Sequence, residues 1–328
     1  MEEALRTYIR VNKTIGGWTD WVQGAGGNCS VKFTDANDES RILVKQSGTA
    51  LADAKWVCCN ASAIRNSLAL GEENIEHAIT GFTINGAKPS IEAFFHCLPA
   101  PVIVHLHPAP LLPLLCRPDL TELHLTGFKT QVIEYAKPGI PLAALIAAAH
   151  ERRPDTNVYF LKNHGVLLLG ESLTEILGQM AQIANDLFPA SSPRTNMALC
   201  SALAKEMPDK VLKSFFNGPT VYAFRPYSPD IAVFLQSAPL CLSGRNVHDH
   251  VRRLHAYREE HSVFPTVILH NSVSYVIGQS LLQCYGIYEI LYSYMSVRVN
   301  NSSDYDTLRD EQVHELVNWD KEKERRRG

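Results

Sequence analysis

The sequence lacks a hydrophobic run long enough to span a bilayer, and its first residues lack the basic and apolar regions of a signal peptide. It also lacks an excess of charge of one sign, because 31 basic residues face 34 acidic ones and the formal net charge is −3. Proteins that bind nucleic acid or anionic membranes usually carry a basic excess. We therefore expect a cytoplasmic protein with neither nucleic acid nor membrane as a partner.

Two further absences concern cysteine and glycine. The eight cysteines are scattered and form no CxxC pair, which favours reduced, mostly buried thiols over disulfides. No glycine fingerprint of a dinucleotide-binding domain occurs, so we expect no such domain in these residues. What remains is an ordinary globular composition, 45% hydrophobic and 20% charged over 328 residues, enough for one large or two modest domains.

The most informative segment is an apolar run that begins at Val102 and leads into His105 and His107. Side chains two residues apart on a strand leave the same face, so both imidazoles can bind one ion. A second apolar run, 158–161, ends just before His164, and Glu92 lies earlier in the same part of the chain. Three imidazoles and one carboxylate can form a catalytic metal site with a position open for substrate.

Periodicity and capping residues predict the secondary structure. Strands and helices mix without strict alternation, which favours a mixed, mainly antiparallel sheet with flanking helices over a doubly wound parallel sheet. We expect two domains, residues 1–210 and a C-terminal α+β extension over 211–328 that serves as an oligomer interface or a lid, with the best break at 217–219. The predicted helices are residues 1 to about 15, about 60–70, 142–153, 174–187 and 247–261, and a last helix that begins at about 280. The predicted strands are residues 31–33, 41–45, 102–107, 158–161, 231–234 and 266–270.

Residues 163–172 and 270–280 have similar sequences, and each predicts a strand, a Gly-x-Ser segment and then a helix. A decayed internal duplication explains this similarity. The common use of Gly and Ser at strand-to-helix turns explains it equally well.

The order of these motifs resembles that of the class II aldolase/adducin family, over roughly residues 1–205. The run 42–54 is most similar to the aldolase part of bifunctional rhamnulose-phosphate aldolase/alcohol dehydrogenases. The family includes fuculose-phosphate and rhamnulose-phosphate aldolases, ribulose-phosphate 4-epimerases and a sugar-phosphate dehydratase. The residues that carry the resemblance are Gly26-Gly27-Asn28-Cys29-Ser30, Ser47-Gly48-Thr49, Glu92, His105-Leu106-His107 and Asn163-His164-Gly165.

The resemblance implies a three-layer α/β/α fold, a homotetramer and a divalent metal, most often zinc, with Mn²⁺, Fe²⁺ or Co²⁺ as alternatives. It implies that His105, His107 and His164 are metal ligands and that Glu92 is the general base or a transient ligand. It also implies that Gly27, Asn28, Ser47, Gly48 and Ser90 hold the phosphate of a substrate. The interval from Glu92 to His105 is shorter than usual in the family, which predicts a clipped helix.

The expected reaction is the cleavage of a carbon–carbon bond in a sugar phosphate or related ketose. The enediolate that this cleavage leaves needs a fixed positive centre, which a metal ion supplies. Glu92 must accept a proton, and we expect a partly dry pocket to raise its pKa. An epimerase or dehydratase acting through the same enolate, and a non-catalytic adducin-like scaffold, are the alternatives.

Other histidines are weaker candidates. His248 and His250 lie in a helical pattern, where residues two apart face different directions, so we do not expect a metal site there. His96 lies four residues after Glu92 and either supports it or packs in the core, which is the favoured interpretation.

Overall fold

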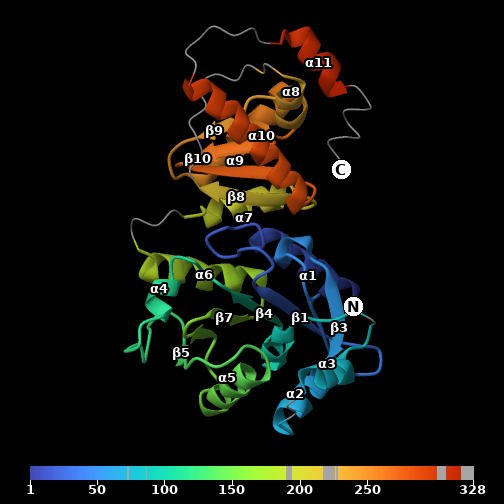
Figure 1. Ribbon diagram of the computed structural model, residues 1–328, viewed down its shortest axis with the longest axis vertical. Helices are drawn as coiled ribbons and strands as arrows, with labels where there is room; N and C mark the ends of the chain where they lie inside the picture. Colours follow the sequence, from blue (N-terminus) through green and yellow to red (C-terminus); the bar gives the residue numbers. More distant parts are fainter. Residues whose placement is uncertain are drawn as a thin grey trace. The chain divides into compact units, whose positions relative to one another are not determined.

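The computed structural model describes residues 1–71, 74–85, 87–189, 194–216, 226, 228–300 and 308–318 (Figure 1). The chain divides into two compact units. The first comprises Met1–Gly16 and Asp20–Ser192, and the second comprises Gly17–Thr19 and Pro193–Gly328. Residue 210, where we placed the domain boundary, therefore falls inside the second unit. The predicted break at 217–219 lies outside the described residues.

A seven-stranded sheet forms the middle of the first unit. The strand order is β3 (Trp56–Asn60), β2 (Ser40–Lys45), β1 (Asn28–Thr34), β4 (Val102–Leu106), β7 (Gly165–Gly170), β6 (Val158–Leu161), β5 (Thr130–Ile133). All neighbours are antiparallel except β5 and β6. The predicted mainly antiparallel sheet is confirmed.

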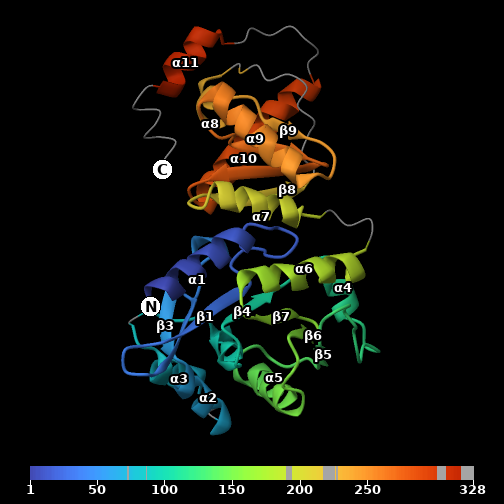
Figure 2. The same cartoon turned by 180° about the vertical axis from the view of Figure 1, so that it is seen from behind.

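Helices cover both faces of this sheet, as Figure 2 shows. On one face, α1 (Glu2–Ile15) packs against β1 and α6 (Leu173–Leu187) packs against β7. On the other face, one hydrophobic core joins side chains of β2, β4, β6 and β7 to those of four helical segments. These segments are α2 (Ala61–Ala69), α3 (Ile75–Phe82), the 3₁₀ helix η2 (Ile91–Cys97) and α5 (Ile140–Arg152). The three-layer α/β/α arrangement is therefore confirmed.

Two short helical segments complete the first unit, η1 (Leu51–Asp53) and α4 (Leu112–Leu115). The start of α2 follows directly from its sequence. The Asn60 side chain accepts hydrogen bonds from the backbone N–H groups of Ser62 and Ala63, which makes it the N-cap of the helix.

The second unit is an α+β structure around a four-stranded sheet, as predicted for the extension. The strand order is β8 (Val211–Phe216), β11 (Val273–Gly278), β10 (Val267–His270), β9 (Leu240–Leu242). Its described helices are α7 (Met197–Glu206), α8 (Pro229–Leu235), α9 (Val247–His261), α10 (Leu281–Asn300) and α11 (Asp310–Asn318). None of the described helices is long and apolar enough to cross a membrane.

One predicted strand is wrong, because residues 231–234 belong to helix α8. Ile231, Ala232 and Val233 are all buried, so the segment shows neither the alternation of a half-buried strand nor the stripe of a surface helix. Pro229 at the first helical position was the signal that favoured a helix.

The second sheet repeats the connectivity of part of the first. In the order β4-β7-β6-β5 the pairings are antiparallel, antiparallel and parallel, and the order β8-β11-β10-β9 has the same sequence of pairings. Both hairpins lead into a helix whose first turn is capped in the same way. Ser172 accepts from the N–H of Glu175, and Ser280 accepts from the N–H of Gln283. This match favours duplication as the origin of the repeated sequence.

His96 lies in the core of the first unit, as the packing interpretation expects. Its ring is fully buried on η2, and its Nδ1 lies 2.8 Å from the Ser30 hydroxyl oxygen on β1. Burial and then the charge of His105 lower the pKa of His96 to about 3. An unfolded histidine titrates near pH 6.5, so the unfolded chain takes up this proton first as the pH falls.

The stability that neutral His96 provides should therefore be complete above about pH 6.5 and lost as the pH falls towards 3. Replacing it with glutamine should reduce the slope of unfolding free energy against pH in this window by up to about 1.4 kcal/mol per pH unit. Urea unfolding between pH 4 and 7 measures the slope. The exposed His124→Gln variant is the control, and equal slopes in the two variants would contradict the prediction.

Candidate metal centre

The structure brings His105, His107, His164 and Glu92 together, although they come from three separate parts of the chain. Each offers one ligand atom, and the four atoms lie within 4.8 Å of one another. The Nε2 atoms of His105 and His107 are 2.9 Å apart, and those of His105 and His164 are 3.3 Å apart. The Glu92 Oε1 atom lies 3.3 Å from His164 Nε2 and 3.4 Å from His105 Nε2.

The four separations of 2.9–3.4 Å are those expected around a single metal ion. Two nitrogen ligands about 2.0–2.1 Å from a tetrahedral zinc lie about 3.3 Å apart. The tautomer of His105 fits as well, because its Nδ1 lies 2.8 Å from the Val166 carbonyl oxygen and donates to it. In a neutral ring this bond places the proton on Nδ1 and leaves Nε2, which faces the cluster, free to bind an ion, which is the usual way a protein orients a ligating histidine.

Two glycines make room for His107. A Cβ atom on Gly165 would lie 2.2 Å from the Leu106 carbonyl oxygen and 3.0 Å from His107 Cδ2. A Cβ atom on Gly26 would lie 3.0 Å from His107 Nδ1. The turn that carries His164 also needs an unusual backbone, because Asn163 has φ of 57°. The glycines therefore set the position of the imidazole.

Electrostatics keep the imidazole of His107 neutral. Burial and then the charge of His105 lower the pKa of His107 to about 3, and a neutral imidazole is the form that binds metal. Glu92 departs from our expectation. Burial raises its pKa, as predicted, but the charge of His105 and hydrogen bonds from His105 and His164 outweigh burial, and the pKa lies well below its usual range. Glu92 is therefore ionised beside the imidazoles.

Two of the residues predicted to hold a phosphate, Gly27 and Asn28, lie at the start of β1 beside His105. Asn28 on β1 pairs in register with His105 on β4. Both polar atoms of the Asn28 side chain are buried and have no hydrogen-bond partner among the described residues. Such a group needs a partner, and a ligand can supply one. Gly27, just before it, has φ of +73° and approaches the His105 carbonyl oxygen closely.

Ser47, Gly48 and Ser90 lie on two loops that are bonded together. The Ser47 N–H donates to the Lys88 carbonyl oxygen, and the Ser90 N–H donates to the Lys45 carbonyl oxygen. The Ser90 hydroxyl accepts from the N–H of Glu92, which joins this loop to η2. Gly48 has φ of +73° and open space where a side chain would lie. The loop can therefore approach a substrate closely.

Lys45 is a component of this region that the candidate residues named from the sequence do not include. It is only 3% exposed, and its ammonium donates to the carbonyl oxygens of Ala25 and Thr49 at 2.5 and 3.0 Å. Burial lowers its pKa, and the charge of Glu92 partly opposes the change. Lys45 joins the glycine loop to the serine loop. In the sequence, Lys45 ends an apolar run between two glycine motifs, which indicates a place near the site but not its burial.

His248 and His250 lie on helix α9, as predicted. The His250 ring is buried, and its Nε2 donates to the Ser243 carbonyl oxygen.

Comparison with known proteins shows the family to which the first unit belongs. Residues 8–185 match the model of the class II aldolase and adducin N-terminal domain. The chain belongs to this family. Class II aldolases use a divalent metal, and the histidine and glutamate cluster of this member could bind one.

Individual relatives of this family member are distant. The chain is 25% identical over 182 residues to a Bacillus subtilis (strain 168) protein named "uncharacterized oxidoreductase YuxG". That match covers 50% of this chain and 25% of the relative, so the chain spans about a quarter of its length. The N-terminal class II aldolase domain of a conserved Thermoplasma acidophilum protein is 24% identical, with a TM-score of 0.45, over 52% of this chain and 84% of that one. An L-fuculose-1-phosphate aldolase from Thermus thermophilus is 18% identical, with a TM-score of 0.39, over 59% of this chain and 100% of that one.

The close approach of Gly165 to the Leu106 carbonyl oxygen and the His107 ring can be tested by substitution. Gly165→Ala should lower the unfolding free energy by about 1–3 kcal/mol, because the added methyl group meets backbone and the His107 ring. Gly178→Ala, in helix α6 with open space at the same point, is the matched control and should raise stability by up to about 1 kcal/mol. Urea denaturation measures both. Equal stability of the two variants would show that the fold does not depend on this close approach.

Proposed function

We propose that this chain is a metal-dependent aldehyde-lyase that cleaves a carbon–carbon bond in a sugar phosphate or a related ketose. The convergence of three imidazole Nε2 atoms and one carboxylate beside the unpartnered amide of Asn28 carries this proposal. Family membership supports the reaction class. We further propose a homotetramer in carbohydrate metabolism, and the eight free cysteines support a reducing compartment such as the cytoplasm.

In this proposal His105, His107 and His164 hold the ion, with zinc the first choice and Mn²⁺, Fe²⁺ or Co²⁺ as alternatives. A divalent ion bound by neutral imidazoles supplies positive charge where the substrate becomes an enediolate. Glu92 takes a proton from the substrate hydroxyl and returns one later. It also lies close enough to serve as a transient fourth ligand.

The substrate phosphate binds the loops that carry Gly27, Asn28, Ser47, Gly48 and Ser90. Backbone N–H groups beside glycines with positive φ can turn toward an anion. The Lys45 ammonium adds a positive charge at the junction of the two loops. Its burial keeps it in place while a phosphate binds and leaves.

Metal content is the first test. The purified protein should contain about one zinc, manganese or iron ion per chain by elemental analysis, and His107→Ala should lose it because only two of the three imidazole ligands remain. The control is His124→Ala, whose exposed ring lies outside the cluster. Absence of metal from the unmodified protein, even after zinc is added, would contradict the lyase proposal and favour an adducin-like scaffold.

Glu92→Gln separates chemistry from metal binding. It should reduce aldehyde release from ketose phosphates by about 10²–10⁴-fold, because glutamine cannot accept the proton, and the three histidines should retain the ion. A screen that follows new aldehyde, inverted ketose and loss of water distinguishes an aldolase from an epimerase or a dehydratase. Full activity in this variant would remove Glu92 from the role of base.

A further inference from the structure

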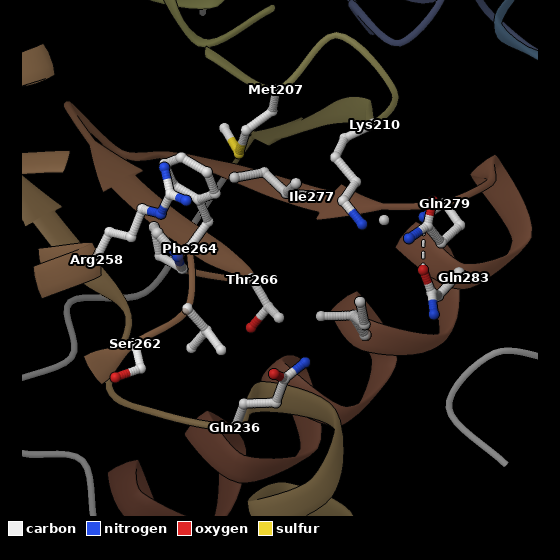
Figure 3. Close-up of a pocket in the computed structure, with 14 residues that line it drawn as sticks. Met207, Lys210, Gln236, Arg258, Ser262, Phe264, Thr266, Ile277, Gln279 and Gln283 are labelled. Carbon is white, nitrogen blue, oxygen red and sulfur yellow. Dashed lines mark hydrogen bonds between the residues drawn. The ribbon is translucent and has the colours of Figure 1, made fainter. Parts of the chain in front are cut away.

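The second unit contains a cavity of about 450 Å³ at one end of its sheet. This volume is within the range of pockets that bind small molecules. Figure 3 shows its lining, which comes from the α7–β8 turn, the end of α8, the α9–β10 connection, the end of β11 and the start of α10. None of the lining residues belongs to the candidate metal centre. They are Met207, Lys210, Gln236, Arg258, Ser262, Val263, Phe264, Pro265, Thr266, Ile277, Gly278, Gln279, Gln283 and Ile287.

The charge of this lining has one sign. Lys210 and Arg258 are cationic, and no aspartate or glutamate is among the lining residues. The Arg258 guanidinium lies 4.7 Å from the centre of the Phe264 ring, so a cation–π contact holds it at the wall. Among the residues that the structure describes, neither cation has a carboxylate within salt-bridge distance. The cavity therefore favours an anion.

Polar side chains supply further hydrogen-bonding groups. Figure 3 shows Lys210 and Gln236 reaching into the space from opposite sides. Gln279 donates its N–H to Gln283 Oε1 at 2.6 Å, which fixes the Gln283 amide at the start of α10. That helix has 20 residues and no acidic side chain in its first turn, so its N-terminal end adds positive potential.

The backbone at the cavity is strained in two places. Gln236 has φ of 60° and ψ of −44°, and the Ser237 N–H donates to the Leu235 carbonyl oxygen at 2.7 Å. This is a γ-turn with positive φ, a rare conformation for a residue with a side chain. Ser262 also has positive φ, at 59°. Strain of this kind gathers at ligand sites, where it aims side chains.

We propose that this cavity binds a small metabolite that carries a phosphate group. Lys210 and Arg258 bind the phosphate, and the amide of Gln236 donates to it or to a neighbouring hydroxyl. The organic part rests on the apolar wall formed by Met207, Phe264 and Ile287. A sugar phosphate and a nucleoside monophosphate share this chemistry, and both fit the volume. The site would be additional to the proposed lyase site and independent of its metal.

Isothermal titration of the full chain with AMP and with ribose 5-phosphate tests the proposal, with adenosine and ribose as uncharged probes. At least one phosphate compound should bind, more weakly at higher salt, and its uncharged counterpart should bind at least about tenfold more weakly. Lys210→Gln and Arg258→Gln should each weaken binding by about tenfold. Tighter binding of AMP would identify a nucleotide site, and tighter binding of ribose 5-phosphate would identify a sugar-phosphate site.

Matched controls are Lys205→Gln on α7 and Arg253→Gln on α9, two exposed cations that do not line the cavity, and neither should change the affinity. His107→Ala should also leave this affinity unchanged, which separates the cavity from the lyase site. The proposal is overturned if neither compound binds, if the uncharged probes bind equally well, or if binding survives both cavity substitutions and is lost in His107→Ala.

Discussion

The pairing of β4 on both of its edges is the constraint on which the rest of the candidate centre depends. His105 lies between Asn28 of β1 and Leu167 of β7, and all five residues of β4 are buried. A shift of one residue in either pairing would move every side chain of the strand to the opposite face. Such a shift would turn His105 away from the other two imidazoles, so the pairing of β4 with both neighbours holds its ring at the cluster.

The close approach of the chain at Gly165 follows from this pairing. β7 begins at Gly165 and leads directly into the pairing of Val166 with Leu106, so the turn from β6 must pass close to His107. The same turn directs His164 at the cluster. The strand register and the missing side chain at Gly165 therefore bring the three imidazoles together. No long loop is needed to position them.

Much of the centre could be predicted from the sequence, because its signals are local. The spacing of His105, near the end of β4, and His107, just after it, indicates one shared side, and a cap followed by a short helix places Glu92. The role of Lys45 could not be predicted in this way, because its burial depends on two loops that meet only in the folded sheet. The cavity of the second unit could not be predicted for the same reason. Its two cations come from separate segments, the turn before β8 and helix α9, that meet only in the folded structure.

The repeated connectivity of the two sheets shows how little of a site the topology itself determines. Three residues, Lys162, Asn163 and His164, separate the paired ends of β6 and β7, whereas only Asn271 and Ser272 separate those of β10 and β11. The longer turn places His164 outside the strand pairing, where its ring reaches the cluster. In the shorter turn His270 is still part of the strand, and its Nε2 donates to the Gly244 carbonyl oxygen. A difference of one residue in the turn thus accompanies the difference between a candidate metal ligand and a histidine that holds a loop.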